Sequence, residues 1–131
     1  MEQLAAQVRD ALQAELPGGL IGVSYFDENG VGHVFRSEWA GEKYDPEQVD
    51  EVVRDIQLEA LGYGSLEARQ DQSLHATVRV YEDMLDVALP ISQSSGIAFA
   101  LDRDANYDLR EAIHVAEGVV DESAFERPAV E

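Results

Sequence analysis

The sequence predicts one α+β domain, in which a mainly antiparallel five-stranded sheet packs against three helices in the order α-β-β-α-β-β-β-α. Three observations support this class. The 131 residues suit one domain with its own core. Apolar residues recur at helical spacing in three segments and follow strand patterns in five others. Short turns join consecutive strand-like segments, which favours antiparallel pairing with helices on the sheet faces.

The first elements are a helix and a hairpin. Apolar residues at helical spacing predict a helix over 2–16, which Pro17-Gly18-Gly19 ends. Segments 20–27 and 31–36 are rich in strand formers, and the Asn29-Gly30 pair between them is a hairpin turn signal. We expect a loop over 37–44, which contains the only tryptophan and the only lysine.

A second helix is predicted over 45–61. Asp45 can cap it, Pro46 suits the first helical position, and Gln48 can complete a capping box. Gly62 ends it. An apolar stripe runs along one side of this helix, and it consists of Val49, Val52, Val53, Ile56, Ala60 and Leu61.

The C-terminal half predicts three strands and a last helix. Residues 74–81 alternate as a strand does, and 84–91 and 97–101 are apolar strands, whereas 66–72 is a candidate short strand. A helix is expected over 106–116, closed by Gly118. The domain is therefore expected to span 1–118, with 119–131 as a polar, flexible C-terminal tail.

The charge balance indicates where the protein works. It carries 27 acidic residues, eight arginines and one lysine, for a net charge of −18. Such self-repulsion weakens a small folded domain unless salt screens it. Arg is also the more weakly hydrated cation, which suits concentrated salt. We therefore expect a cytoplasmic protein of a halophile that accumulates salt.

The same composition excludes several classes of function. Phosphate binding needs clustered Lys and Arg. The excess of acidic residues in this chain therefore disfavours nucleic acids and anionic membranes as partners. The chain has no cysteine, which excludes disulfides and thiolate metal sites. It shows no signal peptide and no apolar run long enough for a membrane span. No motif for a cofactor is present, and we expect none.

The element order over roughly residues 2–118 resembles the roadblock (dynein-light-chain-like) family and its profilin-like relatives. The hairpin from Gly19 to Val31 looks like the family's opening strand and acidic-Gly turn, and 45–61 looks like its central helix. Segments 84–91 and 97–101 match its last two strands. The chain also resembles small uncharacterised proteins of haloarchaea.

The resemblance implies a non-enzymatic adaptor. Roadblock-like proteins dimerise through the central helix and an adjoining sheet edge, and the dimer contacts small GTPases or their regulators. Carried onto this chain, the interface would be one side of 45–61 plus an edge strand of the opening hairpin. The interface candidates are Trp39, Val49, Val52, Val53 and Ile56. An amphipathic stripe of this kind is more often packed in the core of its own domain, and Trp39 suits either burial or a protein contact.

The segment 102–108 is a weak candidate for a metal site. Its oxygen-bearing residues alternate as in a calcium loop, and they are Asp102, Asp104, Asn106 and Asp108. Tyr107 stands where that loop requires Gly, and Ile113 stands where it requires Glu. A solvated loop that caps the last helix explains the same residues. The three histidines lack the close spacing of zinc ligands.

The sequence leaves a main hypothesis and an alternative. The main hypothesis is a homodimeric adaptor or regulator that binds a protein partner. The alternative is a small-molecule-binding sensory module with a pocket between sheet and helix. An enzyme ranks last, because the sequence has no nucleophile motif, metal motif or phosphate loop.

Lowering the salt should unfold the protein. We expect helix and strand signal to be lost as KCl falls from molar to ~0.1 M, because the Debye length then grows from roughly 3 Å to roughly 10 Å and the repulsion between acids acts over longer distances. Circular dichroism across this range measures the loss. Spectra that do not change would contradict the halophile interpretation.

Overall fold

The computed structural model describes residues 1–126, and 127–131 lie outside the described part of the chain. The elements follow one another as α1 (Glu2–Glu15), β1 (Leu20–Asp27), β2 (Gly30–Arg36), α2 (Glu38–Lys43), α3 (Pro46–Ala60), α4 (Tyr63–Gln70), β3 (Thr77–Val80), β4 (Met84–Pro90), β5 (Gly96–Asp102) and α5 (Leu109–Glu126). This arrangement confirms the predicted α+β class and the single domain with a five-stranded sheet.

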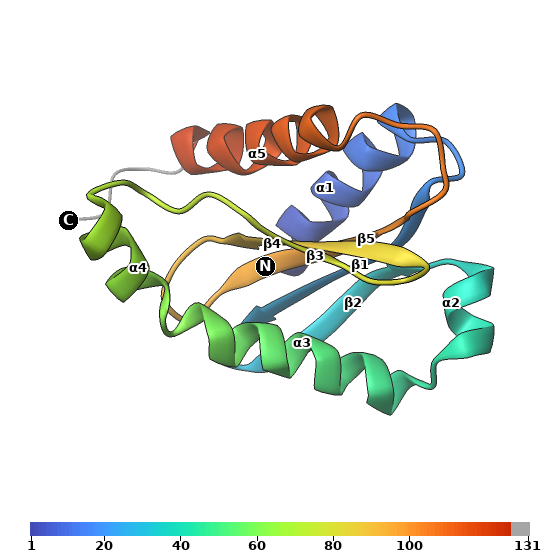
Figure 1. Cartoon of the computed structure of the whole chain (residues 1–131), viewed down its shortest axis with the longest axis horizontal. Coiled ribbons are helices and arrows are strands. Elements are labelled where there is room, and N and C mark those ends of the chain that lie inside the picture. The colour runs from blue at the N-terminus through green and yellow to red at the C-terminus, as the bar shows by residue number, and fades with distance from the viewer. Residues whose placement is uncertain (127–131) are drawn as a thin grey trace.

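All neighbouring strands of the sheet are antiparallel, in the order β2-β1-β5-β4-β3 (Figure 1). The strands at the two edges are β2 and β3. The β1–β2 register shifts after Val23, so that Val34 is an extra residue on β2, as in a β-bulge. The short pairing of β3 with β4 is regular.

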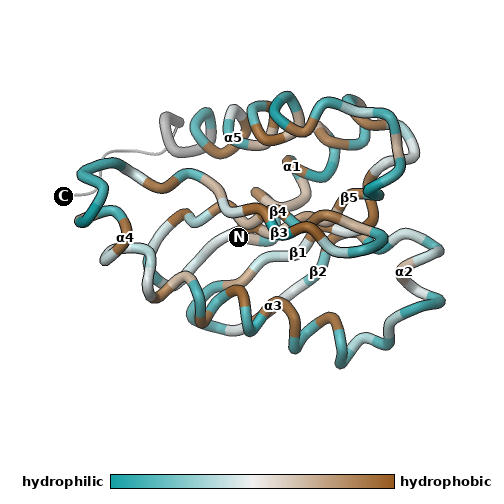
Figure 2. The backbone as a smooth tube through the Cα atoms, in the orientation of Figure 1, coloured by the Kyte–Doolittle hydropathy of each residue, from teal (hydrophilic) through white to brown (hydrophobic). Residues whose placement is uncertain are grey.

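Helices cover both faces of the sheet. Figure 1 shows α1 and α5 together on one face and α3 on the other. Val8 and Leu12 of α1 pack with Phe99 and Leu101 of the sheet and with Ala112 of α5. A smaller cluster lies under α3. Hydrophobic residues run along β4 and β5, and hydrophobic and hydrophilic residues alternate along α3 and α5 (Figure 2).

The predicted capping box fixes the start of α3. The Gln48 amide N–H donates to Asp45 Oδ1 over 2.9 Å, and the Asp45 amide N–H donates to Gln48 Oε1 over 2.9 Å. Pro46 occupies the first turn, as predicted. The helix then buries Val53, Ile56 and Ala60 against the sheet.

Residues 1–126 form five helices, not the predicted three. The expected loop over 37–44 holds α2, because the Ser37 hydroxyl accepts a hydrogen bond from the Ala40 amide and caps a short helix. The candidate strand over 66–72 is wrong. That segment belongs to α4, which Asp71 ends in the left-handed conformation. The run from Leu66 to Gln70 consists of strong helix formers.

Two predicted boundaries also differ from the structure. The strand predicted over 74–81 pairs only from Thr77 to Val80. The last helix does not end at Gly118, because α5 continues to Glu126. Val119 and Val120 beyond the glycine are half-buried against the core, so the apolar side of the helix extends past it. The flexibility of the 119–131 tail stays a prediction, and its residues 127–131 lie outside the described part.

Over residues 1–126, the structure contains no helix with the length and hydropathy needed to cross a membrane.

Removing the α3 cap should destabilise the protein. We expect Asp45→Ala to lower the free energy of unfolding by about 1 kcal/mol, because the Gln48 amide then loses its acceptor. Asp55→Ala is the matched control, since it removes the same charge from an exposed site on the same helix. Denaturant unfolding in molar KCl measures both values. Equal losses in the two variants would contradict a role of the cap.

Candidate functional site

The main pocket of the molecule lies between α3 and the sheet and has a volume of about 470 Å³. Its floor is formed by Gly22 and Ser24 of β1 and by Ala98 and Ala100 of β5. Further along β1, Phe26 fills the space under the C-terminal half of α3. The small floor residues leave the space under the N-terminal half of the helix open.

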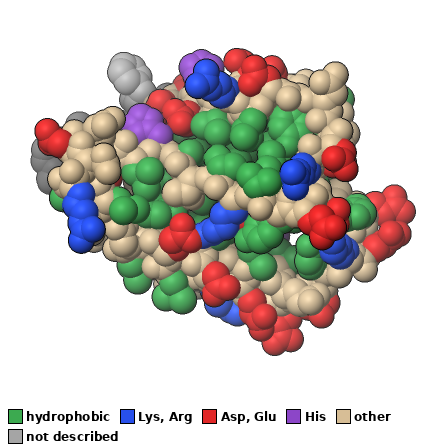
Figure 3. Space-filling view, viewed as in Figure 1, with side chains coloured by type: hydrophobic (Ala, Val, Ile, Leu, Met, Phe, Trp, Pro, Cys, Tyr) green, Lys and Arg blue, Asp and Glu red, His purple; other side chains and the backbone are tan. Residues whose placement is uncertain are grey.

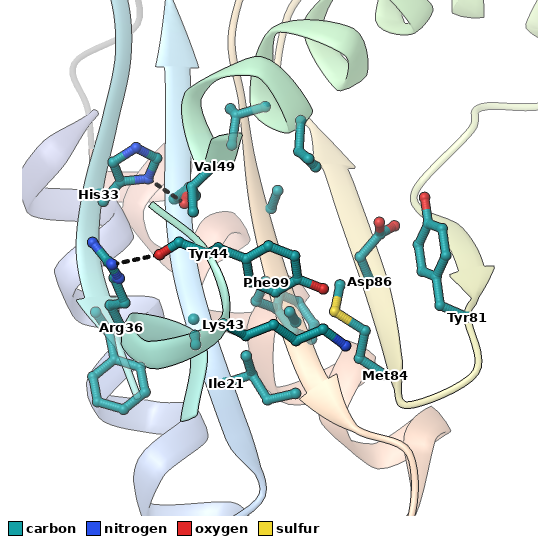
Figure 4. A pocket seen from close by; sticks show the side chains of 18 of the residues that line it. Ile21, His33, Arg36, Lys43, Tyr44, Val49, Tyr81, Met84, Asp86 and Phe99 are labelled. Atoms are coloured by element: carbon teal, nitrogen blue, oxygen red, sulfur yellow. Dashed lines mark hydrogen bonds between the residues drawn. The ribbon is translucent and has the colours of Figure 1, made fainter. Parts of the chain in front are cut away.

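Apolar side chains of α3 form the roof of the pocket, and they are Val49, Val52, Val53 and Ile56. Lys43 and Tyr44, which precede α3, form one wall. Tyr81 and Met84 at the β3–β4 turn form the opposite wall (Figure 4). The pocket therefore has a largely apolar lining, as small-molecule sites usually do.

A buried carboxylate interrupts this apolar lining. Asp86 of β4 lines the pocket and is only 4 % exposed. Its Oδ1 lies 3.5 Å from Arg79 Nη1, whereas Oδ2 has no hydrogen-bond partner among the described residues. Burial raises the pKa of the Asp86 carboxyl, and the charge and hydrogen bond of Arg79 lower it in part.

Arg79 forms ion pairs with two carboxylates at once. It stands directly opposite Asp86 in the β3–β4 register, and it also forms an ion pair with Glu59 of α3. One guanidinium therefore faces two carboxylates, which leaves an excess of negative charge beside the pocket.

A second set of polar contacts joins α3 to β1 and β2, toward the opposite edge of the sheet. Ser24 Oγ lies 2.7 Å from His33 Nδ1, and His33 Nε2 lies 2.5 Å from Asp50 Oδ1. These residues come from β1, β2 and α3. These contacts connect a floor residue of the pocket to the helix above it through an edge strand.

These three residue types also form hydrolase triads, but the surroundings of Ser24 do not suit a nucleophile. Ser24 lies within β1, which pairs with β2 on one side and β5 on the other. Nucleophilic serines instead sit at sharp turns, where free backbone N–H groups can stabilise an oxyanion. The Ser24–His33–Asp50 chain is therefore best explained as a structural tie between helix and sheet.

The only lysine lies at the mouth of the pocket. Lys43 Nζ is 3.3 Å from Asp83 Oδ2 in the β3–β4 turn, and it lies 4.9 Å from the centre of the Trp39 ring. Trp39 and Tyr44 meet edge to face, with their ring centres 6.1 Å apart. Figure 4 shows Lys43 extending across the space between its own helix and Met84.

The five interface candidates from the sequence fall into two groups. Val53 and Ile56 are buried on the side of α3 that faces the sheet, so they belong to the core of the domain itself. Val52 is 43 % exposed, Val49 is half-buried, and Trp39 is 38 % exposed. Only the last three are accessible to another molecule.

In the weak metal candidate at 102–108, the carboxylates of Asp102 and Asp108 accept hydrogen bonds from nearby backbone amides. Asp102 Oδ1 accepts from the Asp104 amide, and Asp108 Oδ1 accepts from the Arg110 amide at the start of α5. Among the described residues, no three His, Cys, Asp or Glu side chains gather as a metal site would require. The Tyr107 hydroxyl is buried, and burial followed by the Asp102 charge raises its pKa. The tyrosine anchors this loop to the core.

The sequence predicts a pocket between sheet and helix only as an alternative, and it does not identify the polar residues of that pocket. Of the histidines, His33 pairs with Asp50, whereas His75 pairs with Glu117 of α5. The one available signal was the position of Asp86, which shares a strand side with Met84 and Ala88 in an otherwise apolar strand.

Solved structures of the same architecture are roadblock domains and gliding proteins. A Roadblock/LC7 domain from Streptomyces avermitilis superposes with a TM-score of 0.61 at 14 % identity, covering 95 % of this chain and 94 % of that one. The gliding protein MglB from Thermus thermophilus gives 0.61 at 17 % identity, covering 92 % and 91 %. MglC from Myxococcus xanthus gives 0.59 at 14 % identity, covering 95 % and 99 %. These likenesses confirm the roadblock fold.

At the level of sequence, residues 6–121 match the family described as "Domain of unknown function (DUF7522)". No curated protein sequence matches the chain.

Asp86 should make stability depend on pH in a defined direction. Because its pKa is raised in the folded protein, its stabilising contribution is present below the ordinary carboxyl pKa of about 3.9 and is lost as the pH rises through the raised value. We therefore expect Asp86→Asn to gain stability relative to the wild type as the pH rises above about 4.

Denaturant unfolding of both proteins in molar KCl at several pH values measures this difference. Asp55→Asn, at an exposed position on α3, controls for the loss of one negative charge. A relative stability of Asp86→Asn that falls with rising pH would contradict the assignment.

Proposed function

This chain belongs to the DUF7522 family, and we propose that it is a non-enzymatic adaptor or regulator that forms a homodimer in the cytoplasm and binds a protein partner. The observation that carries this proposal is an accessible apolar strip, consisting of Val49 and Val52 on α3, beside an unpaired sheet edge at β3. The roadblock fold supports the same class of function.

The two long sides of α3 differ. On one side, Asp50 binds His33 and the Gln57 side chain donates to the Asp27 carbonyl, so this side is tied to the opening hairpin. Val52 and Glu59 are two turns apart and share the opposite side, where Glu59 pairs with Arg79 of β3. The exposed valine therefore faces the β3 edge.

The β3 edge also suits pairing better than the β2 edge does. The bulge at Val34 interrupts β2, and Arg9 of α1 donates to the Val34 carbonyl over 2.9 Å. Bulges and covered backbone groups protect an edge strand from pairing. By contrast, β3 is regular and carries exposed Val78 and Val80. The resemblance implied the hairpin edge, whereas these contacts favour β3 for the dimer.

Figure 3 shows the face that bears the β3 edge, where hydrophobic side chains form a patch bordered by acidic and basic groups. The exposed apolar residues of this edge and of the turn after it include Val78, Val80 and Tyr81. Exposed apolar patches of this kind are typical of protein contacts. We propose that a second copy covers the α3–β3 part and that the assembled dimer presents the rest, including Trp39, to the partner.

The partner that this fold favours is a small GTPase or one of its regulators. Affinity capture from a haloarchaeal lysate in molar KCl, followed by mass spectrometry, tests this directly. Reproducible recovery of such a protein would support the adaptor function. Repeated recovery of the bait alone would count against it.

Introducing a charge at Val52 should dissociate the dimer. We expect Val52→Asp to weaken self-association at least about tenfold, because an unpaired carboxylate would enter an apolar contact. Leu58→Asp is the matched control, since Leu58 is 65 % exposed and lies on the solvent side of the same helix. Light scattering with size-exclusion chromatography in molar KCl measures the mass.

Two results would contradict the dimer. One is a wild-type protein that remains monomeric at high concentration. The other is an equal effect of Val52→Asp and Leu58→Asp, which would place the contact elsewhere.

A further inference from the structure

The pocket beneath α3 combines an apolar lining with one buried, incompletely paired carboxylate. A buried polar atom normally has a hydrogen-bond partner, and leaving one without a partner is costly. Asp86 Oδ2 has none among the described residues, although the side chain is almost fully buried. A ligand that supplies the missing donor would account for both the space and the unpaired oxygen.

We propose that this pocket binds a small organic cation with an apolar body, whose ammonium group pairs with the Asp86 carboxylate. This site shares Val49 and Val52 with the dimer contact of the proposed function, but its recognition group is the buried Asp86 carboxylate, and it does not depend on dimer formation. The pocket volume of about 470 Å³ lies in the range of small-molecule sites. The valines and Ile56 of the roof would contact the apolar body.

The charges around Asp86 favour a cation over an anion. Arg79 is shared by Asp86 and Glu59, so the three groups carry a net charge of about −1 when ionised. Lys43 is engaged with Asp83 at the mouth and does not balance this charge. An ammonium group at Asp86 would complete the pairing inside a region of low dielectric, where the attraction is strong.

The mouth of the pocket has a contact that can open. Lys43 and Asp83 are both largely exposed, and they join α2 to the β3–β4 turn over 3.3 Å. Exposed ion pairs are weak, contributing about 1 kcal/mol or less. Separation of this pair would admit a ligand without disturbing the buried contacts of Val53 and Ile56.

The test compares three probes that share one apolar body: phenylbutylamine, phenylbutanol and phenylbutanoate. Each is titrated into the full-length protein in molar KCl, and amide NMR shifts are followed. We expect saturable shifts at pocket residues with the amine, at least about tenfold weaker binding of the alcohol, and no binding of the carboxylate. Molar salt screens the exposed acids, so binding that survives it requires a buried site.

Two variants test the role of the carboxylate. Asp86→Asn keeps the shape of the side chain, and we expect it to weaken amine binding at least about tenfold. Asp55→Asn removes one charge from an exposed position on α3 that does not line the pocket, and we expect less than about a threefold change. The same NMR spectra show whether each variant is folded.

The proposal fails if the amine binds Asp86→Asn as well as it binds the wild type, or if the carboxylate probe binds equally well. It also fails if the shifts disappear in molar KCl, which would indicate binding to the acidic surface only. A pocket filled by a side chain of a second copy would show shifts at Asp86 that depend on protein concentration, without any amine binding, and would overturn it too.

Discussion

The small residues on the α3 side of the sheet control the rest of this structure. Gly22, Ser24 and Ala100 have small side chains or none and leave space below the N-terminal half of α3, whereas Val53, Ile56 and Ala60 pack with Phe26, Ala88 and Ala98 of the sheet. Its N-terminal half is tied to the sheet by the Asp50–His33 hydrogen bond instead. The pocket and the accessible apolar strip of α3 both result from this uneven support.

The acidic residues at the surface and the one in the interior lie in different electrostatic environments. Most of the acids are exposed, where salt can screen their repulsion. Asp86 is buried beyond the reach of such screening, and its nearest cation is shared with Glu59. A carboxylate in this position lowers stability at neutral pH. Perturbed titratable groups often gather at functional sites, which supports the ligand site that we propose on the α3 side of the sheet.

Local patterns predicted much of the fold and little of the site. The capping box at Asp45, the Asn29-Gly30 turn and the strand alternation each depend on neighbouring residues, and the structure confirms the predicted α+β class with a five-stranded antiparallel sheet. The missed helices α2 and α4 are short, and tertiary contacts stabilise them, such as the Arg36 side chain donating to the Tyr44 carbonyl. The pocket depends on Asp86, Ser24 and Val53 meeting across three elements, and no single segment encodes that meeting.

The placement of the single lysine has a practical consequence for chemistry on this protein. Amine-directed reagents can modify only Lys43 and the N-terminal amino group, and Lys43 stands at the mouth of the pocket beside two aromatic rings. A fluorophore attached there would lie at the contact between α2 and the β3–β4 turn, so its emission would respond to separation of Lys43 from Asp83. The protein's near absence of lysine thus supplies a built-in, site-selective labelling position.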